Sequence, residues 1–277
     1  MRLVTFRVPD GPVGVGELEG DRVHVLAAPS MLHWLAGEGH ERTGTDHAFA
    51  DVELLAPVPE PPSLRDFFAF EGHVQTGFRL RGHDRVPEQW YAAPAFYFSN
   101  PASIHGPGEP VARPAGCQML DFELEIAAVI GAGEEIAGFV LMNDWSARDV
   151  QRGEMQVGLG PAKAKDFATS LGPFLVTPDE LPYTEGRLVM EARVHVNGEE
   201  LARCHADEQH FTWPEIVAHA ARDTRLRPGD VLGSGTLTGG CLLELGPIAG
   251  DRFIEPGDTV ALMAGALGRL ETPVEGD

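Results

Sequence analysis

Three acidic residues in two nearby segments have the spacing of a metal-binding set. Glu123 and Glu125 lie two residues apart in the apolar stretch 120–131. If this stretch is a strand, its two-residue period puts both carboxylates on one face and the apolar residues between them on the other. Asp144 follows a second apolar stretch, 139–142. Two carboxylates beside a core repel each other unless they are neutralised, and Mg²⁺ or Ca²⁺ prefers such oxygen ligands. An isolated Glu-x-Glu pair is more often a solvated acidic face. The later acidic segment favours the metal site.

A basic residue follows the acidic segment closely. Arg148 and Gln151 are three residues apart, so they share a face if this loop turns helical. Arg148 could then bind a substrate carboxylate through a bidentate pair of hydrogen bonds. The alternative is a salt bridge from Arg148 to Asp149 or Asp144.

The elements that must position these residues are mostly strands. Residues 1–58 show short apolar alternations and a short helix near 31–35, and the proline-dense segment 56–62 marks a boundary. Strands are predicted at 120–130, 139–142, 174–177, 188–196 and 259–263, with a hairpin turn at Asn197-Gly198. The clearest helix is 213–222, which has Pro214 at its start. We predict an α+β fold that is mostly β, with a small N-terminal domain at 1–58 and a catalytic domain at 59–277.

Composition restricts the class of protein. The chain has 277 residues, with 43% hydrophobic and 23% charged residues, which is ordinary for a globular protein. Its net charge of −21 would repel nucleic acid and anionic membranes, so an anionic substrate needs a local positive centre. The sequence shows no apolar run of transmembrane length and no signal-peptide pattern, and its three cysteines are far apart. We expect a cytoplasmic protein with no nucleic-acid or membrane partner.

Four motifs together resemble the fumarylacetoacetate hydrolase family, from Leu64 to the end of the chain. They are the segments 121–125, 143–149, 165–167 and 233–236. The resemblance implies a mixed β-roll with a small N-terminal domain, assembled as a homodimer. It also implies Mg²⁺, Mn²⁺ or Ca²⁺ held by Glu123, Glu125 and Asp144. Enzymes of this family cleave carbon–carbon bonds in β-diketo or acylpyruvate acids, and some members decarboxylate, isomerise or hydrate related oxo acids.

The same resemblance suggests catalytic roles. The segment 66–73 resembles the family's active-site segment, with His73 as the base and Glu71 orienting it. Asp66 resembles an additional metal ligand of fumarylacetoacetases. Lys165 resembles a lysine that stabilises negative charge on the substrate, and Glu244 occupies the position of a glutamate that helps to orient the histidine.

Substrate contacts are less distinctive in the sequence. Thr236 resembles a contact to a substrate carboxylate, and Tyr97 is a candidate for lining the pocket, although aromatic residues in such runs are more often core. Lys163 is an alternative to Lys165, and His83 and His105 are alternatives to His73.

The chain also departs from the family's pattern. It is considerably shorter than a fumarylacetoacetase, and Phe68 stands where those enzymes carry tyrosine. The segment between His73 and Tyr97, where we expect substrate choice to reside, matches poorly.

The sequence thus predicts a metal-dependent hydrolase for a small oxo acid of the fumarylacetoacetate type. Oxaloacetate decarboxylation and 2-hydroxy-dienoate isomerisation or hydration are alternatives on the same scaffold. A non-catalytic module that binds calcium or another ligand is a rival from another class, and it would tolerate replacement of His73 and Lys165.

Overall fold

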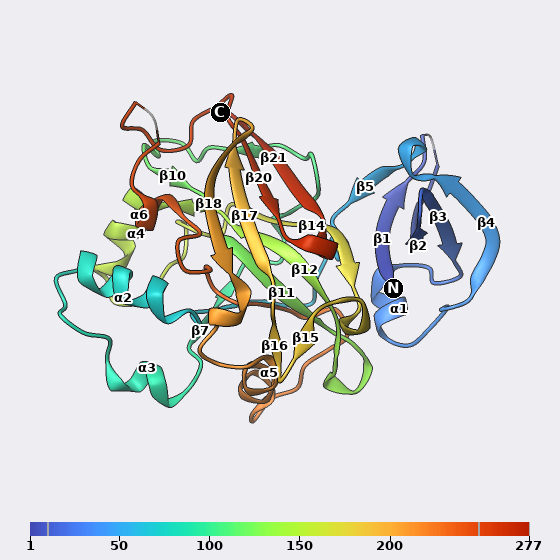
Figure 1. Cartoon of the computed structure of the whole chain (residues 1–277), viewed down its shortest axis with the longest axis horizontal. Helices are drawn as coiled ribbons and strands as arrows, with labels where there is room; N and C mark the ends of the chain where they lie inside the picture. The colour runs from blue at the N-terminus through green and yellow to red at the C-terminus, as the bar shows by residue number, and fades with distance from the viewer. Residues whose placement is uncertain (10, 249, 277) are drawn as a thin grey trace.

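The N-terminal part of the chain is a small antiparallel sheet with one short helix. The structure, a computed structural model, describes residues 1–9, 11–248 and 250–276 (Figure 1). This part contains β1 (Arg2–Arg7), β2 (Val13–Glu19), β3 (Arg22–Leu26), α1 (Met31–Leu35), β4 (Arg42–Ala48), the 3-10 turn η1 (Phe49–Asp51) and β5 (Glu53–Leu55). The predicted antiparallel element and the predicted helix near 31–35 are both confirmed.

A long mixed sheet continues from this part into the body of the protein. Its other strands are β6 (Leu64–Phe67), β7 (Phe96–Ser99), β8 (Ile104–His105), β11 (Leu124–Ile130), β12 (Ile136–Asp144), β14 (Thr169–Val176) and β19 (Val231–Gly233). The strand order is β4-β3-β2-β1-β14-β12-β11-β19-β6-β7, with β5 beside β1 and β8 beside β14. The two predicted domains are therefore joined by the pairing of β1 with β14. Their boundary at residues 58 and 59 stays a prediction.

A second sheet packs in the body with the order β18-β17-β20-β21-β9. Its strands are β9 (Val111–Ala112), β17 (Glu191–Val196), β18 (Glu199–His205), β20 (Thr259–Met263) and β21 (Arg269–Glu275). Two short pairs complete the strands, namely β10 (Leu120–Asp121) with β13 (Ser146–Ala147) and β15 (Tyr183–Thr184) with β16 (Arg187–Leu188). The predicted hairpin joins β17 to β18, and Asn197 and Gly198 both have the positive φ that this two-residue turn needs.

Helices are short and lie around the sheets. They are α2 (Glu71–Leu80), α3 (Glu88–Ala92), α4 (Arg148–Met155), α5 (Trp213–Ala221) and α6 (Leu242–Leu245), with 3-10 turns η2 (Ala132–Glu134), η3 (Pro178–Glu180), η4 (Ala206–Glu208) and η5 (Gly265–Leu267). The predicted helix at 213–222 is confirmed as α5, and Thr212 and Glu215 form a capping box at its start. Among the described residues, no helix combines the length and the apolar character that crossing a bilayer requires.

The described apolar residues form three clusters, and the most extensive lies between strands of both large sheets, which fits the predicted, mostly β fold. Trp145, Trp213 and Phe139 are fully buried in it. The predicted strand at 120–130 is broken between β10 and β11, so Glu123 stands in the break while Glu125 lies within β11. The apolar residues around the break still face the core, because Phe122, Leu124 and Ile126 are buried there.

Candidate active site

Four carboxylates from neighbouring strands meet at one end of the long sheet. They are Asp66 on β6, Glu125 on β11, Asp144 at the end of β12, and Glu123 between β10 and β11, and we call them the acidic cluster. One oxygen of each lies within 4.8 Å of the others, and all four side chains are buried. The predicted trio is thus brought together, and Asp66 joins it from a segment more than fifty residues away in the sequence.

A glycine makes room for the cluster. Gly233 on β19 lies between β6 and β11 and pairs with Asp66. A Cβ atom at this position would lie 2.6 Å from Oδ1 of Asp66 and 3.0 Å from Oε2 of Glu125. The backbone N–H of Gly235 then donates to the same two oxygen atoms, at 3.1 and 3.2 Å. The segment 233–236 therefore shapes the cluster through its backbone.

The cluster has the electrostatic character of a cation site. Burial raises the pKa values of Asp66 and Glu125 well above their usual range, and the neighbouring carboxylates raise them further. Oε1 of Glu125 and Oδ1 of Asp144 are buried without a hydrogen-bond partner. Unpartnered buried oxygens among several carboxylates fit a hard divalent cation, because such an ion neutralises their charge and prefers oxygen ligands.

Lys165 is the lysine that reaches this site. Its Nζ lies 2.5 Å from an oxygen of Glu123 and 2.5 Å from an oxygen of Asp144. Burial opposes its charge, but the carboxylates of Asp144 and Glu123 outweigh burial and raise the pKa of Lys165, so the ammonium stays protonated. The alternative, Lys163, is exposed and pairs with Asp166 instead.

The structure assigns Arg148 a different role from the predicted contact with a substrate carboxylate. Arg148 is 3% exposed, and its Nε donates to Asp121 at 2.8 Å. Its Nη2 lies 2.6 Å from Glu123, close enough for an ion pair although the angles are not those of a hydrogen bond. Arg148 forms no salt bridge with Asp149 or Asp144, the alternative partners predicted from the sequence. Because its charge is already shared between two buried carboxylates, Arg148 positions Glu123.

Asp121 is the residue that the sequence interpretation missed. Besides Arg148, its carboxylate accepts hydrogen bonds from the backbone N–H groups of Leu242 and Leu243, at 2.8 and 3.0 Å. It therefore ties the start of α6 to the acidic cluster. The sequence feature that could have identified Asp121 is its position two residues before Glu123, in the same alternation of acidic and apolar residues.

His73 pairs with Glu244, and the predicted contact with Glu71 is not formed. Nδ1 of His73 lies 2.8 Å from Oε2 of Glu244, and both side chains are almost fully buried. Glu71 instead accepts hydrogen bonds from Gln75 and Tyr91 at the more exposed start of α2. The physical reason is helical direction, because residues two positions apart on a helix do not face each other.

The His73–Glu244 pair is linked to the acidic cluster through Asp121, which contacts both Arg148, the partner of Glu123, and the backbone of α6, the helix that carries Glu244. Burial raises the pKa of Glu123, but Arg148 and Lys165 outweigh burial and lower this pKa. His73 adds a smaller contribution in the same direction. The alternative, His105, lies on β8 beside Glu109.

The remaining predicted residues are distributed around the cluster. The hydroxyl of Tyr97 donates to Asp144 at 2.5 Å, so Tyr97 directly contacts one of the predicted metal ligands. Arg148 donates to Gln151 at 3.2 Å, as expected if both share one face of α4. Thr236 is buried in the irregular segment that follows β19. A cavity of about 250 Å³ beside the cluster is lined by Tyr97, Lys165 and the exposed Phe98, among others.

A buried carboxylate cluster beside a His–Glu pair, in a mostly β fold, defines the class of protein as an enzyme with a candidate metal centre. The sequence pattern described as "Fumarylacetoacetate (FAA) hydrolase C-terminal" matches residues 64–275. A second pattern, "Rv2993c-like, N-terminal", matches residues 1–57. The chain belongs to the fumarylacetoacetate hydrolase family, which confirms the resemblance.

Relatives within this family carry different activities in their names. A fumarylacetoacetase of Arabidopsis thaliana is 31% identical over 260 residues, which cover 72% of this chain and 61% of that enzyme. This chain thus spans less than two thirds of that relative's length. A solved structure described as 5-carboxymethyl-2-hydroxymuconate delta-isomerase from Mycobacterium smegmatis is 29% identical, covers both chains fully and has a TM-score of 0.77. A fumarylacetoacetate hydrolase from Exiguobacterium antarcticum, 23% identical with a TM-score of 0.80, shares the fold.

Proposed function

We propose that this protein is a divalent-metal-dependent hydrolase that cleaves a carbon–carbon bond in a β-diketo or acylpyruvate-type acid. The observation that carries the proposal is the buried His73–Glu244 pair beside the acidic cluster. The cluster supplies the oxygen ligands for Mg²⁺ or Mn²⁺, and the pair supplies a positioned base. A binding module would have no use for that base.

The bound cation would polarise the carbonyl group of a chelating oxo acid. Asp66, Glu123, Glu125 and Asp144 would hold it, and Arg148 and Tyr97 would keep two of these ligands in place. The protonated Lys165 compensates part of the negative charge that these ligands bring together.

The proton transfers fall to His73. Its Nδ1 is engaged with Glu244, which leaves Nε2 to accept a proton from water. The resulting hydroxide attacks the distal carbonyl carbon, and the adjacent carbon–carbon bond breaks. The electron pair of that bond moves onto the remaining oxo acid as an enolate. The ammonium of Lys165 stabilises this negative charge, and the imidazolium of His73 returns the proton to the leaving carbon. Two acids result.

Isomerisation is the second candidate function, and one specific observation favours it. The Mycobacterium smegmatis structure described as an isomerase matches this chain over its full length, whereas the plant fumarylacetoacetase is matched over 61% of its own length. Isomerisation of a dienoate would need the same base to move a proton between two carbons, without an attacking water.

Product analysis tests the proposal. The purified protein is incubated with acetylpyruvate, fumarylacetoacetate, oxaloacetate and a 2-hydroxy-dienoate, with Mg²⁺ or Mn²⁺ and with chelator. Metal-dependent release of two acids, abolished in His73→Ala and kept in the control His105→Ala, is the expected result. Conversion of the dienoate without cleavage would replace hydrolysis by isomerisation, and carbon dioxide from oxaloacetate alone would replace it by decarboxylation. Equal activity in His73→Ala and the wild type would refute the assigned base.

A further inference from the structure

Arg65 carries a buried guanidinium with no acidic partner. Its side chain is 6% exposed, and its Nε and Nη1 have no hydrogen-bond partner. Among residues 1–9, 11–248 and 250–276, no carboxylate lies within ion-pair distance of it. The sequence has 42 acidic residues against 21 Lys and Arg, so a partner would have been easy to supply. A buried cation is costly unless something pairs with it.

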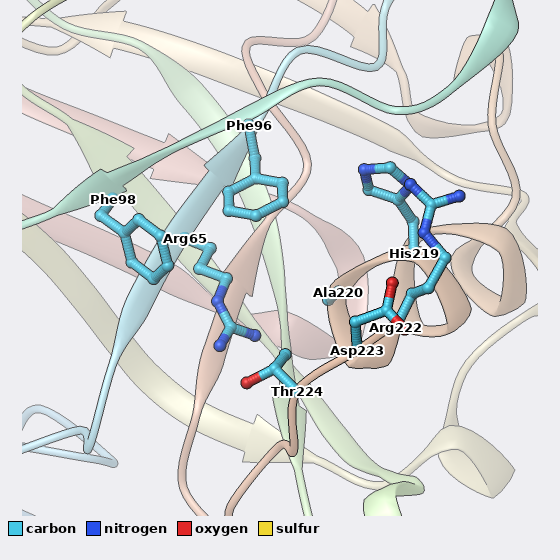
Figure 2. Close-up of a pocket in the computed structure, with 8 residues that line it drawn as sticks. All are labelled: Arg65, Phe96, Phe98, His219, Ala220, Arg222, Asp223 and Thr224. Carbon is cyan, nitrogen blue, oxygen red and sulfur yellow. The ribbon is translucent and has the colours of Figure 1, made fainter.

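This guanidinium faces a cavity of about 330 Å³ (Figure 2). Phe96 and Phe98 of β7 flank Arg65, with ring centroids 5.9 and 5.3 Å from its central carbon. Aromatic rings beside a guanidinium fix its plane and leave its N–H edge free to bind a planar anion. One water in the liquid takes up about 30 Å³, so the cavity has room for a ligand of several heavy atoms.

The other wall of the cavity adds a second cation. Arg222, directly after α5, lines it together with His219, Asp223 and Thr224. Burial and the nearby Arg222 lower the pKa of His219, which is therefore neutral at pH 7. The lining residues thus carry two guanidinium groups and one carboxylate, that of Asp223, so their net charge is positive on a strongly acidic protein; the guanidinium of Arg222 lies beside His219 (Figure 2).

We propose that this cavity binds a small oxyanion, a carboxylate or a phosphate group, which accepts hydrogen bonds from the guanidinium of Arg65, whose Nε and Nη1 are otherwise unpartnered. A guanidinium presents pairs of parallel N–H groups, which suit a two-oxygen acceptor. The site is separate from the acidic cluster. Arg65 and Asp66 are successive residues of β6, and successive side chains of a strand point to opposite faces.

Anion binding to the intact protein tests this inference, whatever reaction the enzyme catalyses. Calorimetry with sodium malonate and with sodium phosphate is run on protein that has been freed of metal with EDTA and then dialysed free of EDTA, so that neither anion is held by a metal, against sodium chloride of equal ionic strength. We expect the wild type to bind at least one of the two anions, and Arg65→Met to bind it at least about tenfold more weakly, since one charged bidentate contact is lost. Arg2→Met is the matched control, because Arg2 lies over the ring of Phe174 away from this cavity.

A second variant keeps the test decisive if Arg65→Met does not fold. Asp223 is exposed, and Asp223→Asn removes the only carboxylate among the residues described as lining the cavity, so it should tighten anion binding. No binding of either anion by the wild type, equal binding by Arg65→Met, or no gain in Asp223→Asn would overturn the proposal. So would sedimentation showing that Arg65→Met turns a dimer into a monomer, because Arg65 would then pair with a carboxylate of a second copy.

Discussion

Replacement of Arg148 by methionine should destabilise the fold strongly and in a pH-dependent way. Methionine keeps most of the length of the side chain but removes the charge that Asp121 and Glu123 share. Removing one member of a buried ion pair leaves an uncompensated charge and costs about 3 to 5 kcal/mol. At the lower figure, the melting temperature should fall by roughly 6 to 12 °C.

The pH dependence follows from the pKa shifts of the two carboxyl groups. Burial raises the pKa of Asp121, and Arg148 opposes that rise. Without Arg148, the pKa of Asp121 in the folded protein moves further above its value in the unfolded chain. The unpaired charge of Asp121 therefore destabilises the fold at high pH, and this destabilisation disappears as the carboxylate takes up a proton at lower pH. For Glu123, burial raises the pKa, but Arg148 and Lys165 outweigh burial and hold it below its usual range. The Arg148→Met variant loses this stabilising interaction with Glu123 at every pH above the pKa that Glu123 has in the unfolded chain. The loss of stability should therefore be larger at pH 8 than at pH 5.

Urea unfolding followed by fluorescence at both pH values measures this effect in the metal-free protein. Arg42→Met is the control, because Arg42 also contacts two carboxylates, Glu17 and Glu19, but at the surface. Its change should be much smaller, since exposed ion pairs contribute little. The double variant Asp121→Asn, Arg148→Met should recover part of the lost stability. A single variant as stable as the wild type, or a loss that is the same at pH 5 and pH 8, would refute the reasoning.

Three other variants or treatments test the site and its surroundings. Glu244→Gln should lower kcat by about 10²-fold or more with Mg²⁺ affinity unchanged, because His73 loses its carboxylate partner; an unchanged kcat would remove Glu244 from the mechanism. Gly233→Ala should weaken Mg²⁺ binding in calorimetry at least tenfold, since its methyl group would press on the acidic cluster, whereas Gly153→Ala, with open space around it, should bind as the wild type does. Burial raises the pKa of Cys204 to about 12, with a further contribution from Glu244. The thiol should therefore react with iodoacetamide at pH 8 at least about 100-fold more slowly in the folded protein than in urea, and the native rate should rise with pH. Equal rates in both states would contradict the burial of this thiol.

Local patterns in the sequence were sufficient for much of the secondary structure. The helix at α5 is encoded by adjacent residues, since Thr212 and Glu215 cap it and Pro214 suits its first turn. The turn between β17 and β18 is equally local, because Asn197 and Gly198 tolerate the positive φ it requires. The break between β10 and β11 was not predictable in this way, because it depends on bonds to distant parts of the chain. The backbone N–H of Glu123 donates to the side chain of Asn143, and Leu124 donates to Gly240.

The sequence by itself determined which chemical groups this protein has and, through the alternation of Glu123 and Glu125, that two carboxylates would stay near each other. Only the tertiary structure decided their partners. The family resemblance named both Glu71 and Glu244 as residues that orient His73, and only Glu244 contacts it, because the start of α6 is fixed by Asp121 while Glu71 points away on α2. A two-residue spacing constrains side chains on one element, whereas contacts across more than a hundred residues depend on how strands and helices pack. For the same reason the unpaired guanidinium of Arg65 became visible only once β6, β7 and α5 were assembled around it.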